Sequence, residues 1–143
     1  MRDRAPTSDV LAAAAVAAVL SGAPSTAHAL LTRGDPLEAS LAAGTLLLPH
    51  EQRAPRLLAA AAVAHAALSL GWAFVLAALL PRRHATIAGA AAGIAIAALD
   101  LGVVGRRVAR IRALPLAPQV LDHVAFAVTV ATVLERRSVS RRR

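Results

Sequence analysis

The sequence predicts an all-α fold, a polytopic transmembrane helical bundle with four spans and one short interfacial or re-entrant helix. Hydrophobic residues make up 57% of the chain and its mean hydropathy is +0.60, whereas ordinary globular domains are about 45–50% apolar. A soluble domain of 143 residues lacks the interior volume to bury so much apolar surface. Long uncharged runs alternate with arginine clusters, so we expect residues 1–143 to form one multi-pass domain in the cell membrane.

The first predicted span covers residues 10–31, which as a helix would be about 33 Å long, enough to cross a hydrocarbon core of about 30 Å. Pro24 lies inside this run and predicts a kink. The segment also has features of a secretory signal peptide, a basic start followed by an apolar stretch and an A-x-A pattern ending at Ala29. Because the apolar run continues beyond that pattern, we interpret it as a span and keep cleavage of residues 1–29 as the alternative.

A short helix is predicted over residues 36–48, because Asp35 suits the N-cap, Pro36 the first helical position and Glu38 a capping box. We expect it to stop before Pro49. Its length of about 20 Å is too short to cross a bilayer, so an interfacial or re-entrant position is expected.

The second and third spans are predicted over residues 57–80 and 85–104. The first of these runs is uncharged and ends at Pro81. Because only a few residues separate the two spans, we expect an antiparallel hairpin.

The fourth span is predicted over residues 114–134, where Pro115 and Pro118 should confine the regular helix to the later part. A basic tail over residues 135–143 follows. Arginine counts on the two sides only slightly favour cytoplasmic termini.

All 16 basic residues are arginine, and the formal net charge is +8. Nucleic-acid surfaces usually combine basic groups with stacking aromatic side chains, but this chain has only Trp72, Phe74 and Phe126. We therefore expect the arginine clusters to meet anionic lipid headgroups, and no nucleic acid as a partner.

Gly89 and Gly93 form a GxxxG pattern in the third span, which is typical of close helix packing in lipid. Asp100 lies seven residues beyond Gly93 and therefore on nearly the same helix face. A carboxylate within the membrane indicates a functional or partnered site. The alternative is that Asp100 reaches the interface or pairs with Arg106 and Arg107.

His65 is the only ionisable residue well inside the second span. In an antiparallel hairpin His65 and Asp100 would lie at similar depth, where a His–Asp contact could relay protons. The alternative is a histidine bonded to a backbone carbonyl or to Ser69.

Asp122 and His123 open the fourth span, and adjacent helical positions point in directions about 100° apart. With His65 and Asp100 they contain the ligand types of a metal site, but no tight spacing such as HExxH is present. Cysteine is absent from the sequence. We therefore predict no metal and no cofactor.

A polar stripe runs along the second half of the first span at intervals of three and four residues: Ser21, Ser25, His28 and Thr32. Such a stripe can line a water-filled path or supply hydrogen bonds between helices. His28 is therefore a further candidate for an intramembrane polar site.

Five peptides resemble those of a group of uncharacterised small multi-span membrane proteins from actinobacteria: SGAPST at residues 21–26, DPLEA at 35–39, AAG at 42–44, ALDLG at 98–102 and PQVLDH at 118–123. The resemblance covers most of the chain and implies location and architecture but no activity. An alanine- and arginine-rich composition without lysine also suits a high-GC genome.

Two principal functional hypotheses follow from the sequence, and an intramembrane enzyme or metal-binding protein is the third. The first is a non-enzymatic helical bundle that self-associates or serves as a subunit of a larger membrane assembly, because small residues and GxxxG favour helix association. The alternative is a small proton-coupled transporter or channel that uses His65 and Asp100. The sequence contains no GxSxG, phosphate-binding loop or coherent catalytic triad, so we do not expect an enzyme.

Overall fold

The computed structural model describes residues 5–81 and 84–141, and the regular secondary structure within these ranges is entirely helical. Four helical stretches are long and apolar enough to cross a membrane: Thr7–Leu31, Ala54–Leu79, Ala85–Arg107 and Leu116–Ser140. Large apolar side chains on their outer faces are exposed, including Val19, Leu31 and Ile87 at 81%, 85% and 71%. Lipid tails would solvate these faces. The predicted all-α bundle with four spanning helices is confirmed.

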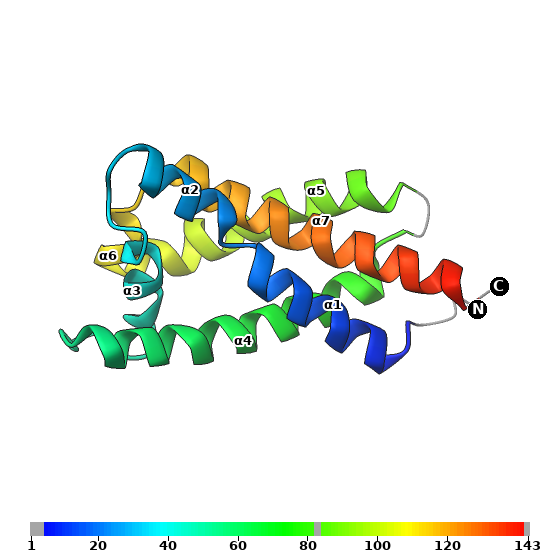
Figure 1. Cartoon of the computed structure of the whole chain (residues 1–143), viewed down its shortest axis with the longest axis horizontal. Coiled ribbons are helices and arrows are strands. Elements are labelled where there is room, and N and C mark those ends of the chain that lie inside the picture. The colour runs from blue at the N-terminus through cyan, green and yellow to red at the C-terminus, as the bar shows by residue number, and fades with distance from the viewer. Residues whose placement is uncertain (1–4, 82–83, 142–143) are drawn as a thin grey trace.

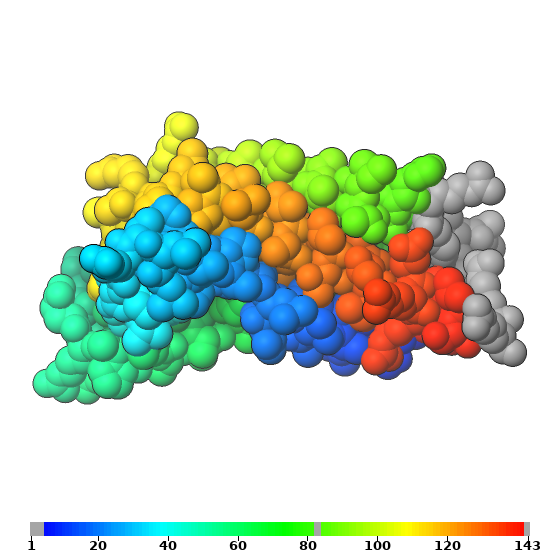
Figure 2. Space-filling view, turned by 45° about the horizontal axis from the view of Figure 1, so that its top comes forward, coloured from blue at the N-terminus to red at the C-terminus, as the bar shows by residue number. Residues whose placement is uncertain are grey.

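The chain passes along the bundle four times in alternating directions (Figure 1). The elements are α1 (Thr7–Leu20), α2 (Ala23–Leu31), α3 (Glu38–Gly44), α4 (Ala54–Leu79), α5 (Ala85–Leu99), the π-helical turn η1 (Asp100–Val104), the 3₁₀ turn η2 (Gly105–Arg107), α6 (Ala109–Arg112) and α7 (Leu116–Ser140). The short helices α3 and α6 lie at one end of the bundle, and the start of α1 and the end of α7 lie at the other. In the space-filling view, the segment containing α3 (cyan) lies on the face shown, towards the same end of the bundle as α6 (Figure 2).

Helix α7 is the centre of the bundle and packs against α1, α2, α4 and α5. Helices α4 and α5 run antiparallel, as expected, but they are not among the helix pairs in extensive contact, because the principal partner of α5 is α7. The two helices are therefore antiparallel, as the sequence predicts, but they do not pack against each other as a hairpin.

Two glycines explain the close approach of α5 to α7. A Cβ atom on Gly93 would lie 2.5 Å from the Cα atom of Val124 and 2.7 Å from the carbonyl oxygen of His123. A Cβ on Gly89 would lie 2.9 Å from the carbonyl oxygen of Ala127. The GxxxG face is thus used within the chain itself.

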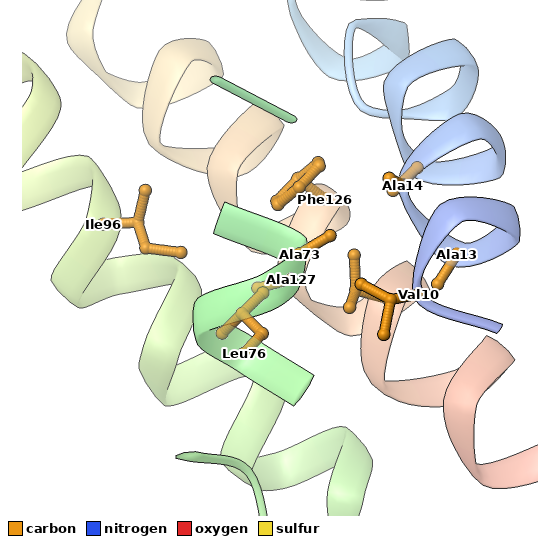
Figure 3. Close-up of a cluster of buried hydrophobic side chains, with 10 residues drawn as sticks. Val10, Ala13, Ala14, Ala73, Leu76, Ile96, Phe126 and Ala127 are labelled. Atoms are coloured by element: carbon orange, nitrogen blue, oxygen red, sulfur yellow. The ribbon is translucent and has the colours of Figure 1, made fainter. Parts of the chain in front are cut away.

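A cluster of buried apolar side chains joins α1, α4, α5 and α7, and half of its labelled members are alanines (Figure 3). Ala13 and Ala17 of α1 and Ala127 of α7 are fully buried, and they meet Val10 and Phe126 in one apolar cluster. Alanine surfaces allow the backbones to approach closely, so dispersion contacts can replace the missing hydrophobic driving force in lipid.

Asp9 lies at the terminal end of this cluster, in the first turn of α1, and its side chain is only 6% exposed. Nη1 of Arg137 lies 3.2 Å from its Oδ1 atom, and Arg141 contacts Oδ2. The three residues tie the start of α1 to the end of α7. Helix α7 continues to Ser140, so the first part of the segment expected to be a basic tail is helical.

The first span is interrupted at Ser21 and Gly22, as Pro24 predicts. Pro24 occupies the second position of α2, where its missing N–H removes no intrahelical bond. The first span begins at Thr7, before the expected start at residue 10.

The short helix spans only Glu38–Gly44, and the expected capping box over residues 35–38 does not form. Oδ1 of Asp35 accepts a hydrogen bond from the Leu37 N–H at 2.8 Å, so the aspartate supports a turn before the helix. Glu38 instead accepts two hydrogen bonds of 2.8 Å from Arg110. These bonds hold the pKa of the Glu38 carboxyl below its ordinary value and join α3 to α6.

Helix α7 is regular from Leu116, so the expected restriction to its later part is wrong. Pro115 is the N-cap and Pro118 falls in the first turn. Amide groups of the first turn have no intrahelical acceptor, and proline is tolerated there.

Candidate functional site

A cavity of about 500 Å³ occupies the half of the bundle that carries α3 and α6. Most of its lining is apolar. The polar residues that line it are Ser21, Ser25, Ser40, His65, Ser69, Trp72, Asp100, Gln119, Asp122 and His123. Four of the five polar candidates from the sequence therefore open onto one space. The fifth, His28, is half-buried on α2 and does not line it.

The break in the first span creates this cavity. Helix α1 packs against both α4 and α7, but beyond the break α2 follows α7 while α3 packs against α4. The space that opens between α2 and α4 is filled only in part by α3, which contributes Ala39, Ser40 and Ala43 to the lining.

His65 bonds a backbone carbonyl group at the end of α1, just before the break. Its Nε2 atom lies 2.9 Å from the carbonyl oxygen of Ala18, in the last turn of α1. The final carbonyls of a helix lack intrahelical donors, and a carbonyl can only accept, so Nε2 is assigned the hydrogen. This contact is the backbone-carbonyl alternative for His65, and the expected contact with Asp100 does not form.

Asp122 accepts a hydrogen bond from a backbone amide group at the start of α2, just after the break. Its Oδ1 atom accepts the Ser25 N–H at 2.9 Å, in the first turn of α2. The N-cap of α2 is Gly22, which has no side chain to satisfy this donor. Asp122 thus acts as an N-cap supplied by α7, and its charge faces the positive end of α2.

We expect Asp122→Ala to uncap α2 and destabilise the folded state by about 1 kcal/mol. Hydrogen exchange at the Ser25 amide should accelerate, measured by NMR in nanodiscs. Thr32→Ala is the control, because Thr32 lies at the other end of α2 and its hydroxyl bonds carbonyl groups of that helix, those of His28 and Ala29. If Asp122→Ala left the exchange at residue 25 unchanged, the capping role would be wrong.

Asp100 is the centre of the second polar cluster. The indole Nε1–H of Trp72 on α4 donates to its Oδ2 atom at 3.1 Å, and Nε2 of His123 on α7 lies 3.5 Å from the same oxygen. Arg106 and Arg107 are exposed, and the contacts of Asp100 are with α4 and α7 instead. Sequence reasoning placed His65 opposite Asp100, whereas Trp72, seven residues further along α4, takes that position.

Asp100 also begins the π-helical turn η1, which follows α5 directly and continues into the 3₁₀ turn η2. Single π turns inside α-helices occur frequently at functional sites. Sequence reasoning missed this turn, and the only local signal was Gly102 and Gly105 close behind the aspartate.

The contacts of His123 indicate where the cluster can hold a proton. Its Nδ1 atom lies 2.7 Å from the carbonyl oxygen of Gln119 and must therefore carry a hydrogen. Nε2 then faces Oδ2 of Asp100, and the two atoms would present lone pairs to each other unless one proton lay between them. One proton between Nε2 of His123 and Oδ2 of Asp100 would turn this contact into a favourable one.

The polar stripe of the first span is divided by the break. Ser21 and Ser25 line the cavity, whereas the Thr32 hydroxyl donates to the carbonyl of His28 at 2.8 Å on the exposed side. Within residues 5–81 and 84–141, no group of three His, Asp or Glu side chains is close enough together to hold a metal ion.

No protein-family model, no curated protein and no solved structure matches this chain. The resemblance to small actinobacterial membrane proteins therefore stays a prediction. The features of the structure that bear on function are the cavity, the broken first span and the Asp100–His123 pair.

Proposed function

We propose that this four-helix membrane protein is a small proton-coupled transporter, which binds a small molecule in the cavity between α2 and α4. The observation that carries the proposal is the Asp100–His123 pair, arranged for one proton and open to a space of about 500 Å³. A pair of side chains that gains or loses one proton beside a ligand-sized cavity can couple ligand binding in that cavity to its own protonation.

Two irregular elements beside the cavity support a transport role. The break between α1 and α2 and the π turn at Asp100 both contribute lining residues. Transporters commonly place their substrate sites at interrupted helices, because such breaks expose backbone polar groups to a ligand and can act as hinges.

The test is solute-dependent proton movement in proteoliposomes loaded with a pH-sensitive dye. We expect Asp100→Asn and His123→Gln to reduce coupled proton flux by about 100-fold or more, because each removes one member of the proton-holding pair. Glu51→Gln is the control, since Glu51 lies in the loop before α4, outside the cavity. Wild-type flux in the Asp100→Asn variant would overturn the proposal.

A second proposal is self-association through the outer face of α4. The GxxxG pattern that suggested an oligomer is used within the chain, but Ala67 and Gly71 form another small-xxx-small pair and are both exposed. A Cβ on Gly71 would meet nothing within 4 Å. Such a pair permits close approach of a second α4 helix.

Gly71→Leu should abolish cross-linked dimers in native membranes if α4 forms the interface. Ala91→Leu, on the exposed face of α5, is the matched control and should leave cross-linking unchanged. Equal cross-linking of all three proteins, or a strictly monomeric wild type, would contradict this interface.

The arginines at the α6 end are proposed to bind anionic lipid headgroups. Arg106, Arg107 and Arg112 are exposed beside the end of the third span. Basic groups at this position are attracted to negatively charged headgroups.

A further inference from the structure

Building on the proposed transport function, we propose that the ligand is an amphiphilic monovalent cation: an apolar molecule bearing one ammonium group, which exchanges for the proton of the Asp100–His123 pair. The inference rests on the charge, the size and the hydrogen bonding of the cavity, each of which points to the same ligand class.

The lining of the cavity has the opposite charge balance to the rest of the chain. The chain carries a formal net charge of +8, yet no arginine of the described residues lines the cavity. The ionisable side chains that do line it are two carboxylates, Asp100 and Asp122, and two imidazoles, His65 and His123. In surroundings of low dielectric constant this lining attracts a cation and repels an anion.

Asp100 has an oxygen to offer an ammonium group. Among the described residues its contacts with Trp72 and His123 both use Oδ2, which leaves Oδ1 for a ligand. Trp72 also lines the cavity, and indole rings attract cations. Asp122 is a weaker candidate, because its Oδ1 already caps α2.

The size and the apolar lining exclude a bare ion as the natural occupant. A volume of about 500 Å³ falls in the range of sites that bind drug-sized molecules. Leu58, Leu68, Ile96 and Phe126 supply apolar walls that a small inorganic cation would leave uncovered. An apolar body with one charged end satisfies both parts of the lining.

Exchange with a proton keeps the charge of the site constant. Without ligand, one proton lies between Asp100 and His123, and the pair is neutral overall. When the ammonium group binds the Asp100 carboxylate, the imidazolium form of His123 releases its Nε2 proton to water, and the neutral imidazole remains bonded to Gln119 through Nδ1. One cation enters for each proton released, and no covalent bond to carbon is made or broken.

Trp72 provides a built-in probe, because the chain has one tryptophan and no tyrosine. The full chain in zwitterionic nanodiscs would be titrated with a bromoalkyl trimethylammonium, and with an alcohol and a sulfonate that carry the same bromoalkyl chain. Bromine quenches indole fluorescence on contact, and quenching would be corrected for partitioning into protein-free discs. We expect saturable quenching by the ammonium at about tenfold lower concentration than by the sulfonate.

The variants separate the charge effect from folding. Asp100→Asn should weaken ammonium binding about tenfold and Glu51→Gln should not change it. His123→Gln should still bind the ammonium but release no proton in weakly buffered solution, whereas the wild type should release about one proton per cation. This proton count needs no Asp100 variant, so it remains decisive if Asp100→Asn fails to fold.

Each outcome has a defined meaning. Ammonium-selective quenching with proton release supports the inference. Equal quenching by all three probes, or a preference for the sulfonate, overturns the cation class and leaves the cavity as a ligand site. If no probe gave saturable quenching, both this inference and the proposed transport site would be overturned.

Discussion

Gly93→Ala is expected to destabilise the bundle by roughly 1–3 kcal/mol, because the added methyl group overpacks the interface between α5 and α7. The new Cβ would lie 2.5 Å from the Cα atom of Val124 and 2.7 Å from the His123 carbonyl oxygen. Both are backbone atoms, so no side-chain rotation relieves the clash and the helices must separate. The displacement would also move His123 relative to Asp100, since both lie at this interface.

Gly71→Ala is the matched control, and the same chemical change should have the opposite sign there. Within one chain no described atom lies within 4 Å of the Cβ position at Gly71, so in the monomer alanine should stabilise the helix by about 0.5–1 kcal/mol through its better helix propensity. Unfolding of each variant in mixed micelles, followed by far-UV circular dichroism, measures the difference. If both variants shifted stability in the same direction, the close-packing assignment of Gly93 would be wrong.

The double variant Arg137→Gln with Arg141→Gln is expected to destabilise the protein by about 3–5 kcal/mol, because it removes both arginines that pair with the buried Asp9 carboxylate among the described residues. The side chain of Asp9 is 6% exposed, whereas those of Arg137 and Arg141 are 49% and 45% exposed. Water can rehydrate the arginines when Asp9 is replaced, so Asp9→Asn alone should cost about 1 kcal/mol or less.

A double-mutant cycle checks this asymmetry. Adding Asp9→Asn to the double arginine variant should restore most of the lost stability, because the buried charge is then gone. Unfolding free energies of the wild type and the three variants, measured in one micelle composition, provide the comparison. If Asp9→Asn and the double arginine variant lowered the unfolding free energy equally, the burial of Asp9 would not explain the loss of stability.

Local features of the sequence were enough to predict the spans. The length of an uncharged run decides whether a helix can cross a bilayer, and both properties can be read without a partner. The interruption near Pro24 follows from the missing N–H and the fixed backbone of proline, which act within a few residues. The face shared by Gly89, Gly93 and Asp100 likewise follows from helix periodicity alone.

Local rules failed where a partner from another helix decides the outcome. Asp35 and Glu38 have the spacing of a capping box, yet Glu38 bonds Arg110 of α6 because a bidentate ion pair competes with the cap. Asp122 opens the fourth span in the sequence, and only the contact with Ser25 shows that it caps α2.

The sequence by itself determined that this chain forms four apolar helices, because hydropathy and helix periodicity are properties of consecutive residues. Only the tertiary structure decided that α7 packs against α5, that Trp72 and His123 rather than His65 meet Asp100, and that a cavity lies between α2 and α4. The physical reason is that every span is almost uniformly apolar, so hydropathy does not distinguish one partner from another. Backbone approach at the glycines and the few polar groups inside the bundle determine which helices meet.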